Sequence, residues 1–173
     1  MAGFALRAAD DARKPVAVLT TVYRHNSHAD VIASRLVLTD MLDGTGKELW
    51  RSGNDEAAYS GVMVADIGGV RQIVHLNADA LTGTDRKTGK QLWRTPVKTG
   101  AKRNTGTPVI FGDHVAVNSQ TVGLVAFKIS QSSGGWTATE DWANKKLPIN
   151  IATPVFVGDY LYSQGAAKDF ICA

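Results

Sequence analysis

The sequence has little cysteine, no long apolar run and little net charge, and each shortage excludes a class of protein. Its single cysteine, Cys172, excludes a disulfide within the chain. Its apolar runs all fall short of the roughly 18 residues that a membrane-spanning helix requires, so no transmembrane segment is predicted. The net charge is only +3, and the one short basic stretch, Lys98 to Arg103, is typical of a solvated loop. Nucleic acid is therefore not a predicted partner.

Several catalytic signatures are also missing from the sequence. It contains no Ser-His-Asp arrangement and no G-x-G-x-x-G fingerprint. The two Gly-Lys pairs, in "GTGKEL" and "KTGKQL", lack the leading glycine and the Ser or Thr of a phosphate-binding loop. Hydrophobic residues nevertheless make up 44% of the chain, which is enough to form a core and excludes wholesale disorder.

The first 14 residues support two interpretations. They contain a short apolar patch and small residues, as the end of a secretory signal does, but they lack its basic start and a full apolar segment. Residues 1–14 are therefore either a disordered tail or the remnant of a signal peptide.

Residues 15–43 differ in pattern from the rest of the chain. "PVAVLTTVY" is a continuous apolar, β-branched run, which predicts a strand buried on both faces, as in a parallel sheet. Ser27 and Asp30 then form a capping box, and apolar residues follow at helical spacing up to residue 42. The pattern predicts a short β-α segment.

Residues 44–173 contain a repeat. Trp50 and Trp93 stand 43 residues apart, and "TPVIFGDHV" returns as "TPVFVGDYL" 46 residues later. A period of this size, with short strands separated by Gly, Asp and Asn, predicts propeller blades of about four strands. The predicted fold is mainly β: a partial β-propeller of about three blades in an incomplete ring, over approximately 44–93, 94–142 and a truncated 143–173.

The repeated motif has a structural explanation. The Asp85 carboxylate is expected to accept hydrogen bonds from the backbone of its own turn. Gly89, after Thr88, is expected to supply the positive φ of that turn, and Trp93 a large surface for packing against a neighbouring blade. The predicted structural motif residues are Asp85, Thr88, Gly89, Trp93, Gly46, Trp50 and Trp142.

The stretch "LTGTDRKTGKQLWRTPV" resembles the A-x-D-x-x-T-G-x-x-x-W signature of PQQ-like repeats. Such repeats build the propellers of quinoprotein alcohol dehydrogenases and of BamB-type outer-membrane assembly lipoproteins, and the resemblance covers residues 44–173. It implies a non-catalytic repeat scaffold of the bacterial periplasm or extracellular space that binds a protein or a saccharide. Residues 14–36, by contrast, resemble the start of an unrelated secreted bacterial α/β protein of unassigned function.

Two expectations follow from the repeat count. Closed propellers typically have four to eight blades, so we expect the chain to be a fragment of a larger protein. Open blade edges leave unpaired backbone groups and half-covered tryptophans, so we also expect the chain to self-associate.

Two enzyme alternatives remain open at this point. The parent protein could be a PQQ-dependent quinoprotein dehydrogenase, although this chain lacks the Cys pair often found in that family, and PQQ is expected only in a full-length parent. Otherwise the N-terminal segment could belong to an α/β enzyme with a metal site at His25, His28 and Asp30, since imidazole and carboxylate groups bind Zn or Fe. No catalytic residue is assigned, and His75 and His114 are expected to have structural or surface roles.

Overall fold

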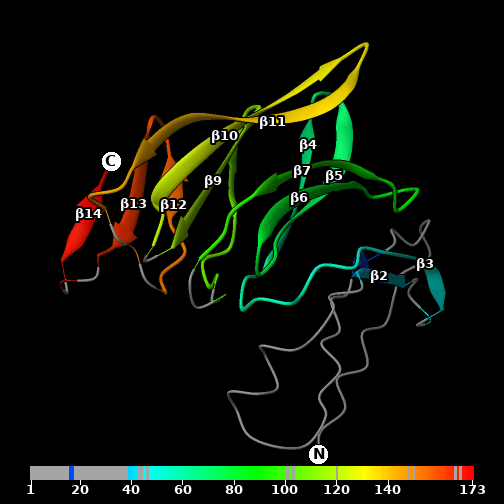
Figure 1. Cartoon of the computed structure of the whole chain (residues 1–173), viewed down its shortest axis with the longest axis horizontal. Coiled ribbons are helices and arrows are strands. Elements are labelled where there is room, and N and C mark those ends of the chain that lie inside the picture. Colours follow the sequence, from blue (N-terminus) through cyan, green and yellow to red (C-terminus); the bar gives the residue numbers. More distant parts are fainter. Residues whose placement is uncertain are drawn as a thin grey trace, which may run out of the picture.

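The computed structural model of the chain describes residues 16–17, 39–42, 45, 47–99, 102, 104–119, 121–147, 149, 151–165, 167 and 169–173. All regular secondary structure within those ranges is β-strand. The strands form four antiparallel sheets that follow one another along the chain (Figure 1). This arrangement is a partial β-propeller, as the repeat predicts.

The first sheet corrects part of the β-α prediction. It contains β1 (Val16–Ala17), β2 (Thr39–Leu42) and β3 (Glu48–Ser52). Thr39–Leu42 were predicted to end a helix, but they pair antiparallel with both β1 and β3. Pairing across a sheet has overridden the local helical spacing. The rest of the predicted helix lies outside the described residues.

The other three sheets are simple meanders in which each strand pairs with the next. The second contains β4 (Val62–Ile67), β5 (Val70–Leu76), β6 (Ala80–Asp85) and β7 (Gln91–Pro96). The third contains β8 (Val109–Phe111), β9 (His114–Ser119), β10 (Gly123–Ser132) and β11 (Gly135–Asn144). The fourth contains β12 (Val155–Val157), β13 (Tyr160–Gln164) and β14 (Phe170–Cys172).

The repeated Gly-Asp pairs form the turns that open the third and fourth sheets. Gly112 and Gly158 have φ angles of 58° and 61°, in the left-handed region that a side chain disfavours. Each joins the first strand of its sheet to the second, and the preceding Thr-Pro leads into that first strand. The "TP-x-x-x-GD" sequence therefore marks the start of a sheet.

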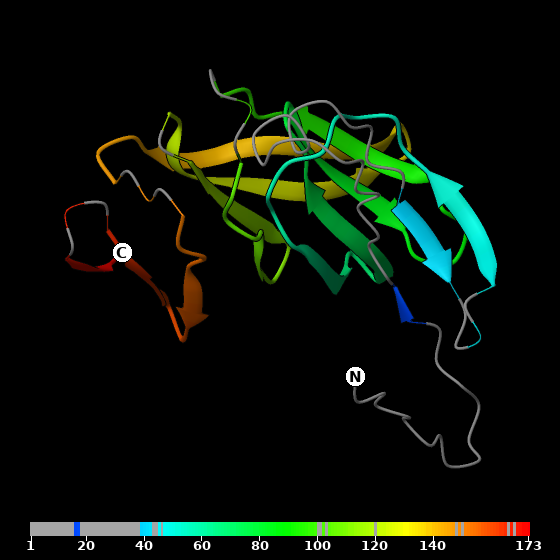
Figure 2. The same ribbon diagram turned by 90° about the horizontal axis from the view of Figure 1, so that it is seen from below.

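The last three sheets follow one another across Figure 2, and two apolar layers hold them together. Between the second and third sheets, Ile67, Val74 and Leu76 pack with Val117 and Phe127. The layer between the third and fourth sheets contains the buried residues Val109, Ala116, Leu124, Ala126, Ile149 and Leu161. The first strands also approach one another in order, β4 beside β8 and β8 beside β12. The sheets therefore pack face to face, as blades do.

Candidate functional site

The predicted metal ligands are not part of the described structure. His25, His28 and Asp30 lie outside the described residues, as does Gly46 of the repeat motif. Among the residues that the structure does describe, no group of three or more His, Cys, Asp or Glu side chains is placed to hold a metal ion. The metal site at His25, His28 and Asp30 stays a prediction.

The turn between β6 and β7 has the geometry that the motif predicts. Oδ1 of Asp85 accepts hydrogen bonds from the backbone N–H groups of Lys87 and Thr88, at 2.8 and 2.7 Å, and from the Thr88 hydroxyl at 2.9 Å. Burial opposes ionisation of Asp85, but the hydrogen bonds from Thr88 and Lys87 lower the pKa of its carboxyl on balance. Gly89 has a φ of 74°. This carboxylate is engaged in closing its own turn.

We expect Asp85→Ala to lower the free energy of unfolding by about 1–2 kcal/mol, because hydrogen bonds to a charged group are lost while the backbone donors stay solvated. Asp85→Asn should lose less, since the amide oxygen still accepts. Urea unfolding followed by tryptophan fluorescence would measure both. The matched control is Lys87→Ala, which leaves every backbone donor of the turn in place. A loss as large in the control as in Asp85→Ala would contradict this role of the carboxylate.

The repeated tryptophans connect neighbouring sheets and strands. Trp50 of β3 donates from Nε1 to the backbone oxygen of Arg86 at 3.0 Å. Its ring also covers Gly89, where an added Cβ would lie 2.7 Å from Cε3 of the indole. Trp50 of the first sheet thus sits on the Thr-Gly turn of the second sheet.

Trp93 and Trp142 have different surroundings. Trp93 is 3% exposed, and its Nε1 donates to Oε1 of the buried Gln72 at 2.7 Å. Its ring lies directly over Gly83 on the adjacent strand. Trp142 of β11 pairs with Ala126 of β10 and is 38% exposed.

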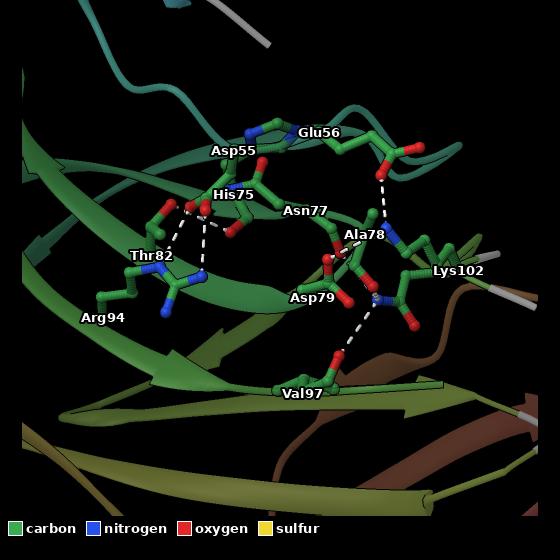
Figure 3. A network of polar contacts seen from close by, with 11 residues as sticks. Asp55, Glu56, His75, Asn77, Ala78, Asp79, Thr82, Arg94, Val97 and Lys102 are labelled. Carbon is green, nitrogen blue, oxygen red and sulfur yellow. Dashed lines mark hydrogen bonds and ion pairs between the residues drawn. The ribbon is translucent and has the colours of Figure 1, made fainter. Parts of the chain in front are cut away.

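A polar network lies at one end of the second sheet (Figure 3). We call Asp55, His75, Asn77 and Arg94 the Asp55 network. Arg94 Nη2 and Nε donate to the two oxygens of Asp55 at 2.9 and 3.1 Å, and Asn77 Nδ2 donates to Oδ2 at 3.1 Å. The hydrogen bond to Asp55 raises the pKa of the Arg94 guanidinium. The carboxylate is therefore held by charge-assisted bonds from Arg94 of β7 and from Asn77, the residue after β5.

His75 is the buried member of the Asp55 network. It is 5% exposed, and burial lowers its pKa to about 4, although the charge of Asp55 and the Asn77 side chain act in the opposite direction. The imidazole is consequently neutral at pH 7.

A second set of contacts extends the network toward the third sheet. Nζ of Lys102 lies 2.7 Å from Glu56 and 3.5 Å from Asp79. Asn104 is fully buried, and its amide donates to backbone oxygens of Asn77, Ala78 and Val97 at 2.7, 3.2 and 3.4 Å. These bonds attach the segment between β7 and β8 to the turn between β5 and β6.

Similar hydrogen bonds from a buried asparagine amide join the third sheet to the segment before the fourth. Nδ2 of Asn118 donates to the backbone oxygens of Ile149 and Ala152, in the segment before β12, at 3.0 and 3.2 Å. The Oδ1 atoms of Asn77, Asn104 and Asn118 are buried without a hydrogen-bond partner in the described part of the chain. Buried asparagine amides thus fasten each inter-sheet segment to a neighbouring sheet.

Sequence reasoning did not single out these asparagines or the Asp55–Arg94 pair. One signal was available: Asn104 and Asn150 each stand three residues before a Thr-Pro pair. No such signal exists for Asp55 and Arg94: Asp55 precedes β4, the first strand of the second sheet, and Arg94 lies in β7, its last strand.

His114 forms a smaller surface cluster. Its Nδ1 lies 2.7 Å from Asp113 and its Nε2 lies 3.2 Å from Asp141. The ring stacks on Phe111 at a centroid distance of 5.3 Å, and Phe111 stacks in turn on Phe156 of the fourth sheet at 4.5 Å. His114 thus caps an aromatic stack that crosses between two sheets.

No helix within the described ranges is long and apolar enough to span a membrane. Comparison with known families gives a match over nearly the whole chain. Residues 13–173 match the family described as outer membrane protein assembly factor BamB. The match includes residues 14–36, which we expected to belong to an unrelated protein. No curated protein matches the chain. With the sheets, the turns and nearly the whole sequence in agreement, the chain belongs to the PQQ-like repeat family of the outer membrane protein assembly factor BamB.

Proposed function

We propose that this chain is a non-catalytic PQQ-like propeller module that serves as a binding scaffold in the bacterial periplasm or extracellular space. The observation that carries the proposal is that its clustered polar groups make structural contacts. The Asp55 network and the buried Asn104 amide hold strands and inter-sheet segments together. Family membership supports the location and the scaffold role.

Two features of the described residues weigh against a PQQ site in this chain. A quinone tricarboxylate needs cationic groups, metal-binding carboxylates and a flat aromatic floor. The candidate cations Arg94 and Lys102 are paired with Asp55 and Glu56, and the Trp93 ring is buried in the core. We infer that this chain binds its ligand, a protein or a saccharide, through its surface and without PQQ.

The test is a titration of the whole chain with PQQ in the presence of Ca²⁺, followed by an assay of dye reduction with primary alcohols. We expect neither saturable quenching of tryptophan fluorescence nor turnover. Stoichiometric PQQ binding with dye reduction would overturn the scaffold proposal and favour the quinoprotein alternative. In parallel, an array of defined saccharides and peptides tests the binding role, and the absence of any saturable ligand would weigh against it.

A further inference from the structure

His114 is the described histidine that lies outside the Asp55 network, and its ring sits between two carboxylates. Nδ1 lies 2.7 Å from Oδ1 of Asp113, and Nε2 lies 3.2 Å from Oδ2 of Asp141. A neutral imidazole has a single N–H, so its other nitrogen would turn a lone pair toward a carboxylate. The protonated ring has an N–H at both nitrogens and a positive charge between the two acids. The geometry is therefore complementary to the protonated form.

The two carboxylates differ in their other partners. Asp113 also lies 3.8 Å from Nζ of Lys128, on β10, so it keeps a cation nearby when the imidazole is neutral. Within the described part of the chain, Asp141 forms an ion pair with His114 alone. Loss of the ring's charge therefore affects Asp141, and hence β11, more than it affects the turn that carries Asp113.

Asp141 stands where the pairing of β11 with β10 is interrupted. Glu140 pairs with Phe127 and Trp142 pairs with Ala126, so Asp141 is an extra residue with no direct partner. Such a bulge disrupts the ladder of hydrogen bonds locally and redirects a side chain. The side chain of Asp141 reaches across β10 to the first residue of β9. The ion pair thus fastens the outer strand at the point where its backbone pairing is weakest.

The ring of His114 is also connected to the fourth sheet. It stacks on Phe111 with an angle of 9° between the rings, and Phe111 stacks on Phe156 of β12. A cation over an aromatic face is attracted to it electrostatically, so protonation favours this contact too. The corresponding first residues of β5 and β13 are Val70 and Tyr160. The histidine is therefore particular to the third sheet.

We propose that His114 is a proton-dependent clamp, which ties β11 to the turn between β8 and β9 when its ring is protonated and releases Asp141 when the ring is neutral. The charged groups that face the ring are Asp113 of the turn, Lys128 of β10 and Asp141 of β11. Histidine is the side chain that ordinarily changes charge between about pH 5 and 8. The clamp goes beyond the scaffold function and does not depend on which ligand the scaffold binds.

Hydrogen–deuterium exchange of the whole chain, measured at about pH 5.5 and about pH 8 on either side of an ordinary histidine titration, tests the clamp. Rates are first corrected for the pH dependence of exchange in an unstructured peptide. We expect the β11 amides beside Asp141 to exchange about two- to fivefold faster at the higher pH, the scale of a part-exposed ion pair. The buried His75 stays neutral in the folded chain across this window. Equal corrected rates at the two pH values would overturn the proposal.

Two variants assign the effect to the clamp. His114→Phe keeps a ring to stack on Phe111 but cannot take up a proton, and Asp141→Asn removes the negative charge from β11. Each should abolish the pH dependence of exchange in β11. The matched control, Asp66→Asn, breaks an exposed ion pair with Arg71 in the second sheet and should leave that dependence unchanged.

Circular dichroism identifies a variant that fails to fold, and the other variant then decides. A pH dependence that survives in either folded variant would overturn the proposal. Nitrogen-15 spectra of the imidazole in the parent chain provide a check that needs no substitution, since both ring nitrogens of His114 should carry protons at the lower pH. A neutral ring at that pH would also count against the clamp. None of these measurements involves PQQ or dye reduction, so the clamp and the proposed function fail separately.

Discussion

Replacing Gly83 with alanine is expected to destabilise the chain by about 3 kcal/mol, the combined scale of overpacking a core and of leaving a buried polar group unpaired. The added Cβ would overlap Cε2 and Nε1 of Trp93. The indole must then move, and its hydrogen bond to Gln72 is lost. Gln72 is fully buried, so water cannot replace the missing donor.

Chemical denaturation of Gly83→Ala, followed by near-ultraviolet circular dichroism of the tryptophans, measures this loss. Gly134→Ala is the matched control, because there a Cβ would meet nothing closer than the Ser132 hydroxyl at 3.7 Å. The double variant Gly83→Ala with Trp93→Leu should lose less than the sum of the two single losses, since removing the ring removes the overlap. Equal stability of Gly83→Ala and Gly134→Ala would show that the close packing of Trp93 on Gly83 is not needed.

Local features of the fold were readable from the sequence. The Thr-Pro and Gly-Asp pairs mark where sheets start, and Asp85 and Gly89 form their turn as expected, because turn chemistry involves neighbours in the chain. Strand β2 was not readable, since Thr39–Leu42 continue an apparent helical spacing and pair with β1, far earlier in the sequence, as well as with the neighbouring β3. Whether a segment forms a strand depends on the strand with which it pairs, and the spacing of apolar residues does not identify that strand.

The contacts between elements were less predictable than the elements. The motif indicates that Trp50 packs on a neighbour, but only the structure shows that its ring lies on Gly89 of the following turn. Asp55 and Arg94 carry no recognisable pattern, and they meet because the second sheet brings its last strand beside the segment that precedes its first. Long-range polar pairs of this kind depend on three-dimensional packing, which is why the Asp55 network was missed.

The buried imidazole of His75 makes stability depend on pH. In the unfolded chain its pKa is the ordinary 6.5, whereas burial lowers the folded value to about 4. As pH falls through 6.5 the unfolded chain binds a proton that the folded chain does not bind until about pH 4, so the free energy of unfolding falls across this window. The full difference corresponds to roughly 3 kcal/mol. Asp55, which faces the imidazole, keeps the loss from being larger.

Urea unfolding between pH 7 and pH 4 should therefore show a steeper loss of stability in the parent chain than in His75→Gln, which cannot take up the proton. Carboxylates also titrate near the lower end of this range, so the comparison of the two chains, rather than either curve alone, isolates the imidazole. Val74→Ala is the control, because it removes fully buried methyl groups from the neighbouring position and should lower stability by a similar amount at every pH. If His75→Gln kept the parent's slope between pH 6.5 and 4, His75 would not be the buried neutral group that the Asp55 network encloses. If His75→Gln instead loses the pH dependence of its free energy of unfolding between pH 6.5 and 4, the Asp55 network stabilises the fold only while His75 stays uncharged. The module is then least stable in acidic surroundings.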